Sequence, residues 1–222
     1  MIEELQCRAL LFDLDGVLVD SLDCVEDSWR RWAKRHGLDW TQVHAVLPGR
    51  RGSEVIRLVA PDLDAWAEMD ALVEHESKAT AGLRVVPGAR ELIEKLPGDR
   101  WAVVTSGHRS VALHRLRFAG LPEPAVLITS EDVRNGKPDP EGYLAAAEQL
   151  KMVPHDCVVI EDAAVGIEAA GRARMASVAV TNGKDPHVLR HATMVVNRLA
   201  EIDVDMGASQ MFVTRAQRSI RA

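Results

Sequence analysis

The stretch Ala9-Leu10-Leu11-Phe12-Asp13-Leu14-Asp15-Gly16 joins an unbroken apolar run to two aspartates and a glycine. An apolar run without alternation is typical of a strand that is buried on both faces of a parallel sheet. Open parallel sheets bind ligands at the carboxyl ends of their strands, which is where Asp13 and Asp15 fall. Two carboxylates so close resist joint ionisation unless a cation neutralises them, so the pair predicts a divalent metal, with Mg²⁺ the usual choice for oxygen ligands. A plain turn is the alternative, because Asp and Gly are common turn residues.

Length and composition favour a small-molecule enzyme. The chain has 222 residues, 47% of them hydrophobic, which suits one large domain or a core with a smaller insertion. Its net charge of -6 argues against nucleic-acid binding. No apolar run approaches the roughly 18 residues of a membrane helix, and the first residues carry Glu3 and Glu4 instead of a basic segment. We therefore expect a cytoplasmic protein that binds no membrane, as a monomer or weak dimer.

The cysteines predict no metal site and no disulfide framework. Cys7, Cys24 and Cys157 are odd in number, far apart and without metal-ligand spacing. We expect buried free thiols.

Six apolar runs, mostly separated by amphipathic helical patterns, predict an α/β fold with a doubly wound, Rossmann-like parallel sheet. One helix is expected after Pro87-Gly88, with a second that is capped by Asp139, has Pro140 at its first position and turns Leu144, Ala147 and Leu150 to one face. Residues 211–213 predict an additional edge strand. The six runs are residues 8–12, 101–105, 125–129, 157–160, 177–180 and 193–196.

Residues 20–82 show helical patterns and much charge but no convincing strand. We interpret them as an all-helical insertion, or cap, and assign residues 1–19 and 83–222 to the core that forms the sheet. An insertion rooted beside Asp13 can act as a lid that excludes water and shapes a pocket. Large aromatic residues usually bury, so we expect the four tryptophans in this region to form its own apolar core: Trp29, Trp32, Trp40 and Trp66.

Polar groups recur where the predicted strands end. Thr105 and Ser106 follow the second strand, Glu161 and Asp162 follow a later one, and Lys137 precedes a capped helix. Each feature has a simpler interpretation, as a helix cap, a helix-dipole partner or a surface lysine. In a doubly wound sheet, however, the carboxyl ends of these strands converge on one crevice.

Four sequence motifs, in this order, resemble those of the haloacid dehalogenase superfamily, in its phosphatase branch with a helical cap after the first strand. They are FDLDGVLVDS at 12–21, VVTS at 103–106, NGKPDP at 135–140 and VVIEDA at 158–163. The resemblance covers almost the whole chain and implies Mg²⁺-dependent hydrolysis of a small phosphate ester.

The resemblance also implies roles for the motif residues. Asp13 would be the nucleophile that forms an aspartyl-phosphate, and Asp15 the general acid and then the general base. Mg²⁺ would be held by the Asp13 carboxylate, the Asp15 backbone carbonyl and Asp162, with Glu161 supporting it directly or through water. Substrate phosphate would be bound by Thr105, by the Ser106 amide and by Lys137, which neutralises charge.

Three further segments resemble bacterial sugar or sugar-alcohol phosphatases of the family, at 21–38, 47–56 and 136–150. By that resemblance Gly49, Arg50 and Arg51 would face the substrate, and an arginine fork suits sugar hydroxyls or a second anion. Related phosphatases often have a histidine where this chain has Pro48.

Three alternatives remain. The phosphoglucomutase-like branch shares all four motifs, but its members carry a histidine where this chain has Val25. Dehalogenases of the superfamily do not keep the second aspartate, here Asp15. A phosphate-binding module without turnover, such as a receiver domain, has no large insertion after its first strand. Mg²⁺-dependent release of phosphate separates the hydrolase from the binding module.

Overall fold

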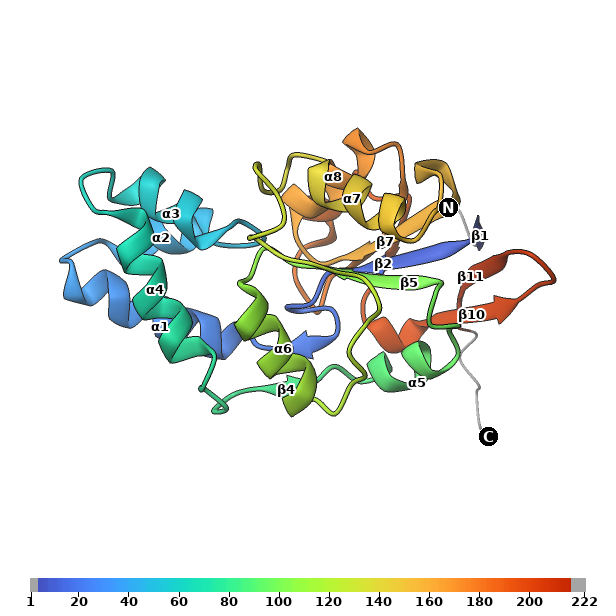
Figure 1. The fold of residues 1–222 in the computed structure, drawn as a ribbon, viewed down its shortest axis with the longest axis horizontal. Helices are drawn as coiled ribbons and strands as arrows, with labels where there is room; N and C mark the ends of the chain where they lie inside the picture. The colour runs from blue at the N-terminus through green and yellow to red at the C-terminus, as the bar shows by residue number, and fades with distance from the viewer. Residues whose placement is uncertain (1–3, 217–222) are drawn as a thin grey trace.

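The computed structural model describes residues 4–216, and its centre is a parallel sheet with helices on both faces (Figure 1). The strand order is β6-β5-β2-β7-β8-β9. Counted along the chain within this sheet, the order is 3-2-1-4-5-6, that of a doubly wound fold whose switch point lies between the first and fourth strands. The predicted fold class is therefore confirmed. The strands are β2 (Ala9–Phe12), β5 (Trp101–Val104), β6 (Leu127–Ile128), β7 (Cys157–Glu161), β8 (Ala176–Val180) and β9 (Met194–Val196).

Both faces of the sheet are covered, as the unbroken apolar runs predict. Leu10 and Phe12 pack on one side, toward α5 (Ala89–Glu94) and α6 (Arg109–Phe118). The intervening Leu11 packs on the other side, toward α7 (Glu141–Gln149) and α8 (Ala164–Arg172). Figure 1 shows these two helices on the face of the sheet opposite α5 and α6. All residues of β2 are fully buried, which contributes about 1.5–3 kcal/mol for each large side chain. A strand so placed can carry polar groups only at its ends.

The helix predicted after Pro87-Gly88 is confirmed, since α5 buries the expected apolar residues. The predicted face of α7 is partly wrong. The helix begins at Glu141, one residue later than predicted, so Pro140 is its N-cap and not its first residue. The Glu141 amide donates to Asp139 Oδ1 at 3.0 Å. The buried face of the helix contains Tyr143, whereas Leu144 is 39% exposed. Both residues lie about one helical turn before Ala147, and the orientation of α7 on the sheet turns Tyr143 inward.

A second, antiparallel sheet lies beside the first, in the order β1-β11-β10. Its strands are β1 (Glu4–Cys7), β10 (Ile202–Met206) and β11 (Met211–Arg215). The edge strand predicted at residues 211–213 is thus a strand, but its place was wrong, because β11 is central and pairs on both sides. Leu5, Val204 and Val213 join the core on one face.

Four helices that pack on one another are inserted in the connection from β2 to β5. They lie between β3 (Val19–Asp20) and β4 (Arg84–Val85), which pair antiparallel and so bring both connections to one place. Trp29 and Trp32 are buried in a separate apolar core, and Trp40 packs against it. Trp66 contradicts the prediction, because it is 69% exposed and stacks with the Arg57 guanidinium instead. The helices, called here the helical insertion, are α1 (Leu22–Arg35), α2 (Trp40–Val46), α3 (Gly52–Val59) and α4 (Ala65–Glu76).

Short 3₁₀ segments complete the described chain. Cys7, Cys24 and Cys157 are buried free thiols, as expected. Among residues 4–216 no helix combines the length and the apolar character that a bilayer crossing needs. The 3₁₀ segments are η1 (Pro154–Asp156), η2 (Pro186–Leu189) and η3 (Leu199–Glu201).

Candidate active site

The predicted motif residues meet at the carboxyl edge of three neighbouring strands. Asp13 follows β2, Thr105 follows β5, and Glu161 ends β7 immediately before Asp162. This edge is the switch point of the sheet, where doubly wound folds bind ligands. Lys137 reaches the same place from the segment that precedes α7. All five are buried, although each carries a polar side chain.

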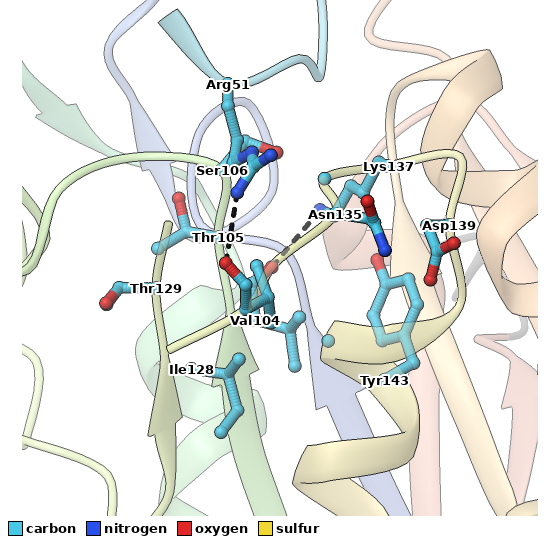
Figure 2. A pocket seen from close by; sticks show the side chains of 13 residues that line it. Arg51, Val104, Thr105, Ser106, Ile128, Thr129, Asn135, Lys137, Asp139 and Tyr143 are labelled. Carbon is cyan, nitrogen blue, oxygen red and sulfur yellow. Dashed lines mark hydrogen bonds between the residues drawn. The ribbon is translucent and has the colours of Figure 1, made fainter. Parts of the chain in front are cut away.

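Lys137 is the centre of the arrangement. Its Nζ donates to Asp13 Oδ1 at 2.6 Å, to Glu161 Oε1 at 2.7 Å and to the Val104 carbonyl at 3.2 Å, the last drawn in Figure 2. Burial by itself lowers the pKa of Lys137, but the two carboxylates outweigh it and hold the pKa well above its ordinary value. The ammonium therefore stays charged, and it links the first, second and fourth motifs.

Glu161 is held by four hydrogen bonds. Lys137 Nζ and the hydroxyl of Tyr143 donate to Oε1, at 2.7 and 2.9 Å. The amides of Asp162 and Ala163 donate to Oε2, at 2.9 and 3.0 Å. The side chain is fully buried, so each bond replaces water that the carboxylate lost on folding. Glu161 thereby fixes the position of the lysine.

Replacing Gly166 with Ala is expected to destabilise the protein by about 3 kcal/mol, because no room exists for the methyl group. A Cβ on Gly166 would lie 1.7 Å from Glu161 Oε1, and this carboxylate cannot shift without losing its hydrogen bonds. Thermal melting measures the effect. The control is Gly171→Ala on the same helix, where nothing lies within 4 Å and stability should stay equal or rise slightly. Equal melting temperatures for both variants would contradict the prediction.

Three carboxylate oxygens, one each from Asp13, Glu161 and Asp162, lie within 4.8 Å of one another. Besides Lys137, the only ammonium group that contacts them within residues 4–216 is that of Lys184, whose Nζ lies 2.8 Å from Asp162 Oδ2. Burial raises the pKa of Asp13 well above its ordinary value, and Lys137 offsets only part of this effect. Burial also raises the pKa of Asp162, to about 6. Three carboxyl groups thus share two ammonium groups, and their hard oxygen donors fit a divalent cation.

The residues of the second motif lie at the mouth of this edge. Thr105 is buried, and its Oγ1 accepts a hydrogen bond from the Gly107 amide at 3.0 Å. Ser106 Oγ donates to the Gly49 carbonyl of the helical insertion at 2.7 Å. The Ser106 hydroxyl therefore has a partner in the insertion, while its backbone amide lies in the turn after β5.

Asp15 lies farther out than Asp13. Its Oδ1 accepts from Ser21 Oγ at 2.5 Å and from Arg115 Nη1 at 2.7 Å. Ser21 stands at the start of α1, at the first connection to the helical insertion. The second aspartate thus contacts the first connection of the helical insertion as well as the core.

A sequence profile of haloacid dehalogenase-like hydrolases matches residues 7–174, a range that contains all four motifs. The chain belongs to this family. The predicted family is therefore confirmed, and the protein is a haloacid dehalogenase-like hydrolase.

Relatives of this hydrolase cover nearly its whole length. Hexitol phosphatase A of Escherichia coli K12 is 40% identical over 205 residues, which cover 90% of this chain and 95% of that protein. Validoxylamine A 7'-phosphate phosphatase of Streptomyces hygroscopicus is 36% identical, over 88% and 95% of the two chains. Among solved structures, beta-phosphoglucomutase from Clostridium difficile has a TM-score of 0.75 at 24% identity, over 89% and 93% of the chains, which shows a shared fold alone.

In this haloacid dehalogenase-like hydrolase the helical insertion touches the active-site edge through the turn at Gly49. A Cβ on Gly49 would lie 2.6 Å from Val165 Cγ2, so the turn approaches the core closely. Arg51 donates to Glu54 and to the carbonyls of Val133 and Arg134. Figure 2 draws Arg51 among the residues that line the pocket, with a dashed line for its hydrogen bond to the Val133 carbonyl.

The contacts of the neighbouring arginines differ. The guanidinium of Arg51 already donates to three protein groups, and two of them are carbonyls of the core. Arg51 therefore joins the insertion to the core, and its contact with substrate stays a prediction. Arg50 is half-buried and makes no ion pair within the described residues 4–216. Its predicted contact with substrate stays a prediction.

The carboxyl groups of the predicted site also accept hydrogen bonds from side chains outside the four motifs, those of Tyr143, Lys184 and Arg115. Arg115 carried a signal in the sequence, because it falls on the apolar stripe of its helix with Ala112 and Leu116. Lys184 carried none, since its approach to Asp162 depends on where the turn after β8 lies.

Proposed function

We propose that this hydrolase is a Mg²⁺-dependent phosphatase that acts on a small sugar phosphate or sugar-alcohol phosphate through an aspartyl-phosphate intermediate. The observation that carries the proposal is the buried Lys137, which bridges Asp13 and Glu161 beside Asp162. Phosphoryl transfer depends mainly on positioned charge of this kind. The relatives named as hexitol and validoxylamine 7'-phosphate phosphatases support the substrate class.

The metal assignment follows from which oxygens are free. Asp13, Asp162 and the backbone carbonyl of Asp15 would hold Mg²⁺, and its charge would offset the repulsion between the carboxylates and a phosphate dianion. Glu161 already accepts four hydrogen bonds, so we assign it to hold Lys137 instead of the ion.

The protein groups then carry out two displacements. In the first, an oxygen of Asp13 attacks phosphorus, the bond to the ester oxygen breaks, and the proton of the Asp15 carboxyl moves to that oxygen. In the second, water attacks phosphorus and gives a proton to the Asp15 carboxylate, while the bond to Asp13 breaks. Lys137 neutralises charge on the nucleophile and the phosphoryl group, and the Thr105 hydroxyl and Ser106 amide donate to phosphoryl oxygens.

We assign residues 20–82 to a cap that must move for substrate to enter. The cavity lined by Thr105, Lys137 and Tyr143 measures about 20 Å³, which is room for about one water molecule. The connections at β3 and β4 lie side by side, so they can serve as one hinge. The bonds from Ser106 and Arg51 would hold the closed state.

The test is phosphate release from hexose, hexitol, pentose, glycerol and 4-nitrophenyl phosphates, with Mg²⁺ and with EDTA. We expect turnover that EDTA abolishes and added Mg²⁺ restores, with a sugar or sugar-alcohol phosphate giving the highest kcat/KM. Folded, metal-replete protein that releases no phosphate from any ester would favour a binding module. Isomerisation of a hexose phosphate without net release would favour a mutase. We do not expect this outcome, because the position of the mutase histidine is held by Val25, an apolar side chain that packs against the core of the insertion.

The same panel tests the cap residues. Arg50→Ala is expected to change the order of the sugar phosphates while sparing 4-nitrophenyl phosphate, because pocket contacts decide between similar substrates. An unchanged order would remove Arg50 from the substrate site.

A further inference from the structure

Arg115 is a buried arginine whose guanidinium donates hydrogen bonds to two carboxylates. It projects from α6 of the core and is 2% exposed. Nη1 donates to Asp15 Oδ1 at 2.7 Å, and Nη2 donates to Glu76 Oε2 at 2.7 Å. Glu76 is the last residue of α4, in the helical insertion. The Arg115 side chain therefore joins Asp15, the proposed general acid and base, to the insertion.

Stability alone does not account for this ion triad. Within residues 4–216, Arg115 Nε is buried without a hydrogen-bond acceptor. Burial by itself lowers the pKa of Arg115, although Asp15 and Glu76 together raise it. Buried ion pairs can often be replaced by packed apolar residues without loss of stability, and the neighbours of Arg115 on its helix include Ala112 and Leu116. The presence of a buried guanidinium at position 115 therefore needs an explanation other than stability.

The geometry at Asp15 supplies one. Both hydrogen bonds that its side chain accepts from residues 4–216 end on Oδ1, from Ser21 and Arg115. The other oxygen, Oδ2, lies 3.9 Å from where a Cβ on Gly107 would be, so it faces the turn after β5. That turn contains the groups proposed to bind phosphate. Oδ1 is thus anchored, and Oδ2 is left to exchange a proton.

The same helix also holds the second connection of the insertion. His114, the residue before Arg115, lies with Nε2 2.8 Å from the carbonyl of Ala79, beyond the end of α4. Two consecutive residues of α6 therefore contact the region where the insertion rejoins the core. Helix α6 therefore contacts both Asp15 and the end of α4.

We propose that Arg115 is a positioning residue for Asp15: it holds Oδ1 so that Oδ2 delivers the proton to the leaving oxygen, and Glu76 ties this orientation to the position of α4. The inference rests on the proposed acid and base role of Asp15. It adds that the Asp15 carboxyl group has the orientation needed for proton transfer only while α4 is placed so that Glu76 contacts Arg115.

The test compares leaving groups in Arg115→Met. With enzyme in excess, release of the alcohol in the first turnover is measured for an alkyl phosphate from the panel and for 4-nitrophenyl phosphate. An alkoxide needs a proton to leave, whereas 4-nitrophenolate does not. We expect the alkyl reaction to slow about 100-fold and the aryl reaction less than about 5-fold, since general acid catalysis contributes factors of this size. In separate steady-state measurements, KM should change little for either ester.

Two further variants make the result decisive. Arg117→Met, on the same helix with a side chain 71% exposed, should behave as the unmodified protein. Glu76→Ala removes the anchor on α4 and leaves the bond to Asp15, so the alkyl reaction should slow about 10-fold with little change for the aryl ester. If Arg115→Met does not fold, Glu76→Ala decides by the same comparison. Equal slowing of both esters, or none, overturns the inference, whereas an unmodified enzyme that releases no phosphate overturns the proposed function instead.

Discussion

Replacing Asp13 with Asn is expected to lower kcat by about 10⁴-fold or more, because an amide cannot form the aspartyl-phosphate. The change is nearly isosteric, and the amide oxygen can still accept the hydrogen bond that Lys137 Nζ now donates at 2.6 Å. The fold should therefore survive, which separates lost chemistry from lost structure. Phosphate release from the best ester of the panel measures the effect, together with a thermal melt.

A second readout for Asp13 is covalent. Brief reaction with substrate followed by acid quenching should leave a phosphoryl group on the unmodified protein but none on Asp13→Asn. Asp203→Asn serves as the control, because its side chain is 41% exposed and pairs with Lys95 far from the site. Turnover above about one per cent in folded Asp13→Asn would rule out a covalent role of this carboxylate.

Replacing Lys137 with Met should damage both catalysis and stability. Without the ammonium, Asp13 and Glu161 are two buried carboxylates with no shared cation, and removing one partner of a buried pair costs about 3–5 kcal/mol. The pKa of Asp13, already raised by burial, loses the contribution that lowers it, so less of the nucleophile is ionised. We expect kcat to fall about 10³-fold, the range for losing a group that stabilises transition-state charge.

The melting temperature of Lys137→Met should fall by roughly 6–20 °C, because each kcal/mol of lost stability lowers it by about 2–4 °C in a chain of this size. The matched control is Lys95→Met, whose ammonium is half-exposed and pairs with Asp203. Exposed pairs contribute at most about 1 kcal/mol, so this variant should melt close to the unmodified protein. A Lys137→Met protein as stable as Lys95→Met would mean that the buried carboxylates do not depend on the lysine.

Several parts of the fold and site were predictable because they rest on local pattern. The six strands of the main sheet are all present, since a strand buried on both faces must be apolar throughout, and the run Ala9–Phe12 shows this directly. The order of the four motifs then places Asp13, Thr105, Glu161 and Asp162 at strand ends. Parallel strands bring such ends to one edge, so their meeting followed from the fold class alone.

Other details could not be read from spacing. Tyr143 and Leu144 are adjacent apolar positions, and only the orientation of α7 on the sheet decides which of them is buried. Trp66 looks like a core residue in sequence, yet α4 turns it to solvent beside Arg57. The strand β11 pairs with β1 from the opposite end of the chain, a contact for which no local signal exists.

Local patterns in the chain were enough to predict the main sheet, the family and the residues of the four motifs, because apolar runs and acidic strand ends are short-range features. The tertiary structure alone decided how the charges are paired: Lys137 with Asp13 and Glu161, and Arg115 with Asp15 and Glu76. Such pairs join residues up to 124 positions apart, across helices and strands whose relative placement depends on packing. Ion pairing requires contact within a few ångströms, and only the folded chain determines distances on that scale.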